Sequence, residues 1–111
     1  MENITVVIGS FVTHSNYSND NTRKIEFSGE RVGSYNYRHD QNRGVDEVLY
    51  RTGDGRLVVH KTSWSHWQGE GTDYSLEEVQ ESDLQIGGGY EALGIECGYG
   101  RSLTLDEALA R

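Results

Sequence analysis

The stretch Val45–Trp67, which reads VDEVLYRTGDGRLVVHKTSWSHW, decides the fold of this chain. Two runs rich in β-branched and aromatic residues, Val45–Thr52 and Arg56–Trp64, flank the short segment Gly53-Asp54-Gly55. Glycine adopts positive φ angles without a Cβ clash, and a short hairpin loop needs such angles. The pattern therefore predicts an antiparallel hairpin near the centre of a sheet.

The residues before this hairpin predict further strands. Ile4–Val12 is a short apolar run, and Ile25 and Phe27 alternate with charged side chains. Between them Thr13–Thr22 is dense in Asn, Ser and Asp, whose side chains bond to their own backbone and favour turns. We expect an exposed, mobile loop there.

A second hairpin is expected next along the chain. Ser28-Gly29-Glu30-Arg31 predicts a type II′ turn with Gly29 at its first central position, and Arg31–Arg38 predicts the return strand. His39–Gly44 is then a polar loop that leads into the central hairpin.

The last third of the chain changes in character. Gln68–Thr72 predicts a flexible joint, and Ser75-Leu76-Glu77-Glu78 fits a capping box, which favours a helical turn. The alternative for these residues is a strand whose side chains alternate between two faces. Short helices are predicted over Tyr90–Ile95 and from Thr104 onward.

These elements predict an α+β fold in one domain of 111 residues. An antiparallel sheet of about five strands would span residues 3–67, and an acidic helical and loop part would span residues 68–111. With 34% hydrophobic residues, the core must depend on its aromatic side chains. The single cysteine, Cys97, favours a reducing, cytoplasmic compartment, and we expect it to pack as a small buried hydrophobe. We expect no signal peptide and no membrane span.

Charge is distributed unevenly along the chain. The net charge is −8, and residues 62–100 hold eight acidic residues with no Lys or Arg. The segments on either side are each neutral in sum. Solubility alone favours interspersed charges of both signs, so this segment indicates either a solvated face or a surface that meets a basic partner.

The second interpretation leads to a candidate partner-binding surface. Aromatic side chains near the start of the acidic segment would be rigid anchors inside an acidic rim. Its carboxylates would stand where a nucleic-acid backbone places phosphates, while the same charge disfavours direct binding to nucleic acid. The surface comprises Trp64, Trp67, Glu70, Asp73, Tyr74, Glu77, Glu78, Glu81 and Asp83.

Three other sites compete with this surface. His60 and His66, six residues apart, would share one face of a strand, and with Trp64 and Trp67 they would form a ligand-binding, metal or general-base site. The glycines from position 87 to 89 suit a tight turn better than a phosphate site, because their surroundings are acidic. Exposed strand edges would make the chain a structural dimer, the third alternative.

The hairpin residues Tyr50-Arg51-Thr52 and Gly55-Arg56-Leu57-Val58-Val59-His60, with a Trp a few residues on, resemble the hairpin of small prokaryotic EXLDI-type proteins. In size, acidity and lack of motifs the whole chain is similar to small inhibitors of phages and mobile elements, anti-CRISPR proteins among them. That resemblance implies a non-enzymatic, cofactor-free inhibitor. Such an inhibitor would occupy a basic, nucleic-acid-binding surface of a larger protein. The resemblance assigns a role to no particular residue.

Overall fold

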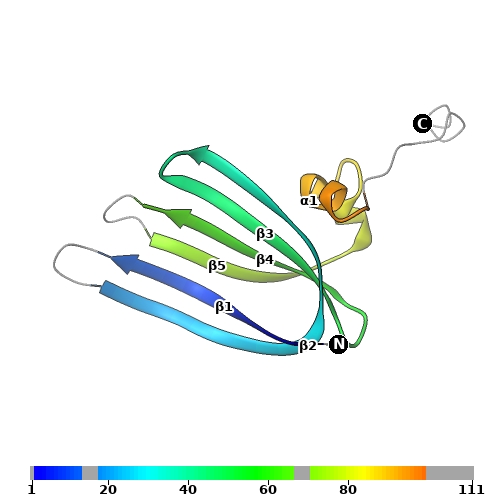
Figure 1. Cartoon of the computed structure of the whole chain (residues 1–111), viewed down its shortest axis with the longest axis horizontal. Coiled ribbons are helices and arrows are strands. Elements are labelled where there is room, and N and C mark those ends of the chain that lie inside the picture. The colour runs from blue at the N-terminus through cyan, green and yellow to red at the C-terminus, as the bar shows by residue number, and fades with distance from the viewer. Residues whose placement is uncertain (1, 14–17, 67–70, 100–111) are drawn as a thin grey trace, which may run out of the picture.

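The computed structural model describes residues 2–13, 18–66 and 71–99. Five antiparallel strands follow one another around a closed barrel, because β1 also pairs with β5 (Figure 1). A 3-10 helix and one short α-helix follow the last strand. The elements are β1 (Glu2–Thr13), β2 (Ser18–Asp40), β3 (Arg43–Thr52), β4 (Leu57–Ser65), β5 (Gly71–Val79), η1 (Glu81–Leu84) and α1 (Glu91–Glu96).

The central hairpin is confirmed. β3 and β4 pair in the register that sets Leu49 opposite Val59, and they lie in the middle of the strand order. Of the two loop glycines only Gly55 has a positive φ, at 88°, so the expectation that both would is half right. The antiparallel sheet of five strands is also confirmed, while the helices of the described residues are one 3-10 turn and one six-residue α-helix.

The predicted type II′ turn at residues 28–31 is wrong. β2 is one continuous strand that bends and changes partner at Gly29, which pairs with Glu2 of β1 and with Thr52 of β3. A Cβ on Gly29 would lie 2.5 Å from the carbonyl oxygen of Arg51, so only glycine lets the strands approach this closely. The chain therefore reverses by bending a strand and not by a tight turn.

Two predicted loops are also shorter than expected. Residues 18–22 already belong to β2, and residues 14–17 lie outside the described part of the chain. The loop expected over His39–Gly44 shrinks to Gln41 and Asn42, because Asp40 pairs with Arg43. The Asp40 carboxylate accepts a hydrogen bond from the Asn42 backbone N–H, which stabilises this two-residue turn.

The helical turn predicted at residues 75–78 is wrong, and the strand alternative is correct. β5 pairs with β4 from Ser63–Asp73 to Leu57–Val79 and with β1 from Val12–Gly71 to Gly9–Tyr74. Along residues 75–78 the ladder with β4 outweighs a local capping preference. A capping box does form, five residues later, between Gln80 and Asp83. The sheet consequently extends to residue 79, past the boundary predicted near residue 67.

Apolar residues lie on both faces of the sheet. Val58 and Val59 are neighbours that point to opposite faces, and both are buried. We call the face partly covered by η1 and α1 the outer face and the one turned into the barrel the inner face. The outer layer comprises Leu49, Val59, Val79, Leu84 and Leu93, and Cys97, expected to be buried, packs against it while partly buried. On the inner face, Ile4 and Val6 are buried, and Phe27 meets Tyr50 edge to face.

The short helix predicted over Tyr90–Ile95 corresponds to α1, shifted by one residue. The helix predicted from Thr104 falls outside the described residues. Within the described part of the chain, none of the helices has the length and apolar character needed to cross a bilayer.

Candidate functional site: an acidic outer face around Tyr90

Strand geometry divides the predicted partner-binding surface. Successive side chains of β5 point to opposite faces, so Glu77 lies on the outer face and Glu78 on the inner one. Glu78 forms an ion pair with Arg56, with 3.5 Å between Oε1 and Nη1. The two glutamates were predicted to act together, and the structure separates them and neutralises one of them in part.

On the outer face, carboxylates from three elements surround one phenol. The Tyr90 hydroxyl, at the start of α1, donates a hydrogen bond of 2.6 Å to Glu77 Oε2 on β5. Burial raises the pKa of Tyr90 well above its usual value, and the negative charges of Glu77, Glu47 and Asp83 raise it further. We call Tyr90, Glu77, Glu47 and Asp83 the Tyr90 cluster. It brings together acids that are far apart in the sequence.

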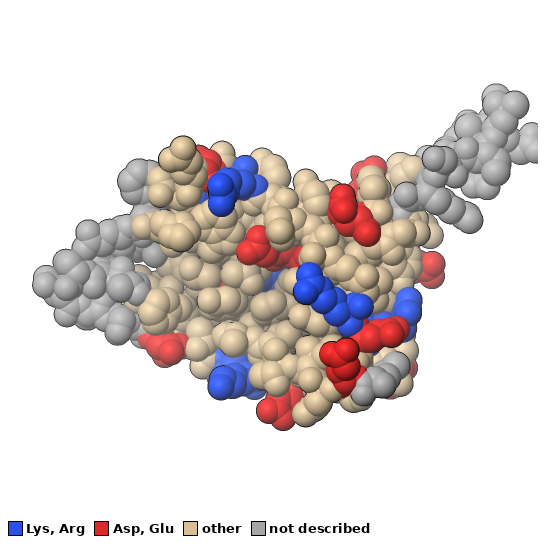
Figure 2. Space-filling view, viewed as in Figure 1, with Lys and Arg blue, Asp and Glu red and all other residues tan. Residues whose placement is uncertain are grey.

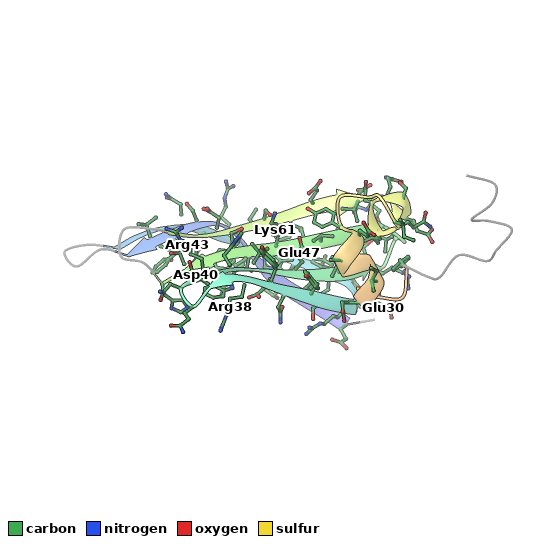
Figure 3. All side chains as sticks on the ribbon, turned by 90° about the horizontal axis from the view of Figure 1, so that it is seen from above. Glu30, Arg38, Asp40, Arg43, Glu47 and Lys61 are labelled. Atoms are coloured by element: carbon green, nitrogen blue, oxygen red, sulfur yellow. The ribbon has the colours of Figure 1, made fainter. Side chains whose placement is uncertain are left out.

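Glu47 and Tyr90 are the two members of the cluster that the sequence analysis did not predict. The partner of Glu47 in the β3–β4 register is Lys61, and Figure 3 shows both side chains together on the outer face. Burial raises the pKa of the Glu47 carboxyl, and the Lys61 ammonium opposes that rise. The signal was present in the hairpin, because a loop at residues 53–55 that pairs Leu49 with Val59 also pairs Glu47 with Lys61.

Other acidic residues stabilise the turns that carry the cluster. The Asp83 carboxylate accepts a hydrogen bond of 2.8 Å from the Gln80 backbone N–H at the start of η1. The Glu91 carboxylate accepts from the Gly87 N–H at 3.4 Å, which uses one donor of the glycine-rich segment within the chain itself. Gly87 has a φ of 88°, as a tight turn requires. Glu81 is exposed beside them on η1.

Trp64 and Asp73 lie at the opposite end of the sheet, where β3 begins and β4 ends. The Trp64 ring lies against Gly44, with the Arg38 guanidinium 5.6 Å from the ring centroid and the His66 ring at 5.0 Å. Trp64 and Asp73 line one shallow hollow of about 480 Å³. Along β5, Asp73 and Glu77 are four residues apart, or about 13 Å at 3.3 Å per residue. Trp67 and Glu70 lie outside the described residues.

The two histidines do not form a shared site. His60 lies on the inner face, where its Nε2–H donates to the Val7 carbonyl at 2.6 Å and its ring stacks on Tyr74. His66 follows the end of β4 and contacts Trp64. Among the described residues, no group of three or more His, Cys, Asp and Glu side chains is placed to hold a metal ion. Tyr74, predicted as an anchor of the partner-binding surface, is half-buried and stacks on His60.

Figure 2 shows that acidic and basic side chains are interspersed over one whole face of the molecule. On that face the acidic side chains form separate groups and not one continuous patch. What the geometry offers is a smaller acidic surface, made of the Tyr90 cluster with Glu81 and Glu91 beside it.

No family model, curated protein or solved structure matches this chain. The functional argument rests on the geometry and charge of the residues themselves.

Proposed function

We propose that this chain is a non-enzymatic binding protein whose acidic outer face occupies a basic, nucleic-acid-binding surface of a larger protein. One observation carries the proposal, namely that the Tyr90 hydroxyl donates to Glu77 of β5 on the outer face, where the charges of Glu47 on β3 and Asp83 on η1 also raise its pKa. Like charges held close together cost free energy in an isolated protein, and a basic partner would recover that cost.

The local shortage of positive charge supports the same proposal. Residues 62–100, which supply β5, η1 and α1, contain no Lys or Arg. Lys61 is the basic neighbour that acts on Glu47, and Arg56 lies at the other face with Glu78 and Asp54. The acidic surface on the outer face therefore keeps most of its charge for a partner.

The test compares two variants that lose the same amount of charge at different places. Glu77→Gln, Glu81→Gln and Glu91→Gln together neutralise the outer surface and keep each side-chain acceptor. The matched control neutralises three exposed acidic residues of β2, Asp20→Asn, Glu26→Gln and Glu30→Gln. Each protein is immobilised, used to capture partners from lysate of the native host, and washed at rising salt.

A partner that the wild-type protein and the control retain, and the outer-face variant loses, is the expected result. A short DNA duplex should then compete with the chain for that partner, because both would use the same basic surface. Equal capture by both variants, or no competition by DNA, would refute the proposal.

A further inference from the structure

β1 and β5 pair over only four positions, from Gly9–Tyr74 to Val12–Gly71. Beyond Gly9 the two strands separate, as Figure 1 shows on the way from the β1 arrowhead back to the N-terminus. Among the described strands, residues 2–8 of β1 pair only with β2. Residues 75–79 of β5 likewise pair only with β4. We call these two facing edges the split edge.

His60 lies at the point where the split edge begins, next to the last pair of the β1–β5 ladder. Its imidazole donates to the Val7 carbonyl, which lies two residues beyond the last rung of the β1–β5 ladder. The side chain thus takes an acceptor that a longer ladder would give to a backbone N–H. Backbone groups of alternate residues point to the same edge of a strand, so those of Asn3 and Thr5 also face the split.

An unpaired strand edge is a template for another strand, and proteins usually protect it with Lys, Pro or a covering loop. Neither Lys nor Pro occurs in residues 2–8 (ENITVVI) or in residues 75–79 (SLEEV). Among the described residues, the His60 imidazole is the only group that bonds to the free edge of residues 2–8. The remaining edge groups are available to an added strand.

We propose that the split edge receives an extended segment of the partner, a strand with Lys or Arg at alternate positions. This inference rests on the proposed function and gives its binding mode. The edges carry Glu2, Glu77 and Glu78, and within the described ranges Arg56 is the one basic residue that forms an ion pair with any of them. Opposite-charge pairs across neighbouring strands stabilise a sheet, and like-charge pairs destabilise it. The same charges disfavour a second copy of this chain as the occupant.

The strand period explains why the basic residues should alternate with apolar ones. On the outer face an inserted strand would lie beside Glu77, a member of the Tyr90 cluster. On the inner face it would lie beside half-buried Leu76 and near the buried layer that includes Ile4 and Val6, while Glu78 on that face is paired with Arg56. Backbone hydrogen bonds would supply affinity, and these two rows of side chains would supply specificity.

The test uses a capped peptide of sequence KVKTKVK as the probe. Its controls are EVETEVE, which reverses the charge, and KPKTKPK, which removes backbone donors. The ¹⁵N-labelled chain is titrated with each peptide, and its amide exchange is measured. Binding of the first peptide should shift the amides of residues 3–7 and 75–79 and protect those of Asn3 and Thr5 from exchange. Both controls should bind at least about tenfold more weakly. Equal binding of the proline peptide, or shifts confined to other residues, would overturn the proposal.

Variants of the chain give an independent check. Thr5→Pro removes an edge donor, and Glu77→Lys reverses an edge charge without changing the backbone. Each should weaken peptide binding at least about tenfold, whereas Glu26→Lys, exposed on β2, should not. If Thr5→Pro does not fold, Glu77→Lys alone decides. A concentration-dependent dimer of the free chain, abolished by Thr5→Pro, would overturn the proposal in favour of self-association.

The two proposals fail in different ways. If the peptide does not bind while partner capture still depends on Glu77 and Glu81, the split edge is not the docking site and the acidic surface is. If capture is insensitive to the outer glutamates and the peptide also fails to bind, both proposals are wrong.

Discussion

Replacing Gly94 by Ala should undock α1 from the sheet. Gly94 is buried on α1, and a Cβ there would overlap the Leu84 carbonyl, with 2.6 Å to its carbon and 2.9 Å to the Leu84 Cα. Those atoms are backbone, so no side-chain rotation relieves the overlap, and α1 must move away from η1. Leu84 and Leu93, both 0% exposed, lie at this contact.

The size of the effect follows from what the movement exposes. Overpacking against a rigid neighbour costs about 3 kcal/mol, and full exposure of both leucines would cost about 3–6 kcal/mol. Alanine returns about 1 kcal/mol of helix propensity relative to glycine. The free energy of unfolding should therefore fall by about 2–5 kcal/mol.

Urea unfolding, followed by tryptophan fluorescence and circular dichroism, measures this loss. Gly89→Ala is the matched control, because a Cβ there has nothing within 4 Å, and its stability should match the wild type. A Gly94→Ala protein less than about 1 kcal/mol below the wild type would show that α1 tolerates the displacement and that the close approach does not matter.

Three further outcomes are expected. Gly44→Ala places a Cβ 2.6 Å from Trp64 Cε2, so the indole should move and its fluorescence should change. The free energy of unfolding in urea should fall by about 1–3 kcal/mol. An unchanged fluorescence spectrum would contradict the packing of Trp64 against Gly44. Tyr90→Phe removes a donor to a carboxylate and should cost about 1 kcal/mol in stability, reduced by partial exposure. Because the pKa of Tyr90 is raised in the folded state, this stabilisation is full below the unfolded pKa of about 10 and is lost as pH rises above it. The gap between wild type and variant in alkaline unfolding curves should therefore shrink, and a gap that widens would exclude the assigned direction. Lys61→Met removes the charge that lowers the pKa of Glu47, so an NMR titration should find that pKa higher than in the wild type; an equal or lower value would mean that the pair does not interact.

Local signals predicted the parts of this fold that local interactions determine. The central hairpin needed only a glycine at the loop and two β-branched runs, and the register that pairs Glu47 with Lys61 follows from it. The helical turn predicted at residues 75–78 was wrong because pairing with β4, an earlier strand, outweighed its capping box. A single sequence does not reveal such pairings.

In the candidate site, too, the sequence predicted what depends on composition and did not predict what depends on strand pairing. The excess of negative charge was read from composition, but its arrangement depends on which face each strand residue takes. A helix would have set Glu77 and Glu78 a hundred degrees apart on one side, whereas a strand sends them to opposite faces. No sequence pattern indicated the hydrogen bond by which the Tyr90 hydroxyl connects the start of α1 to β5.

The continuous strand β2 has a mechanical consequence. Its first half carries β1 and its second half carries β3, with Gly29 bonded into both ladders. Strain applied where β1 and β5 part is thus transmitted along one backbone to the opposite wall of the molecule. Thermal unfolding should accordingly be a single cooperative transition, in which β1 and the first half of β2 unfold together with the other strands.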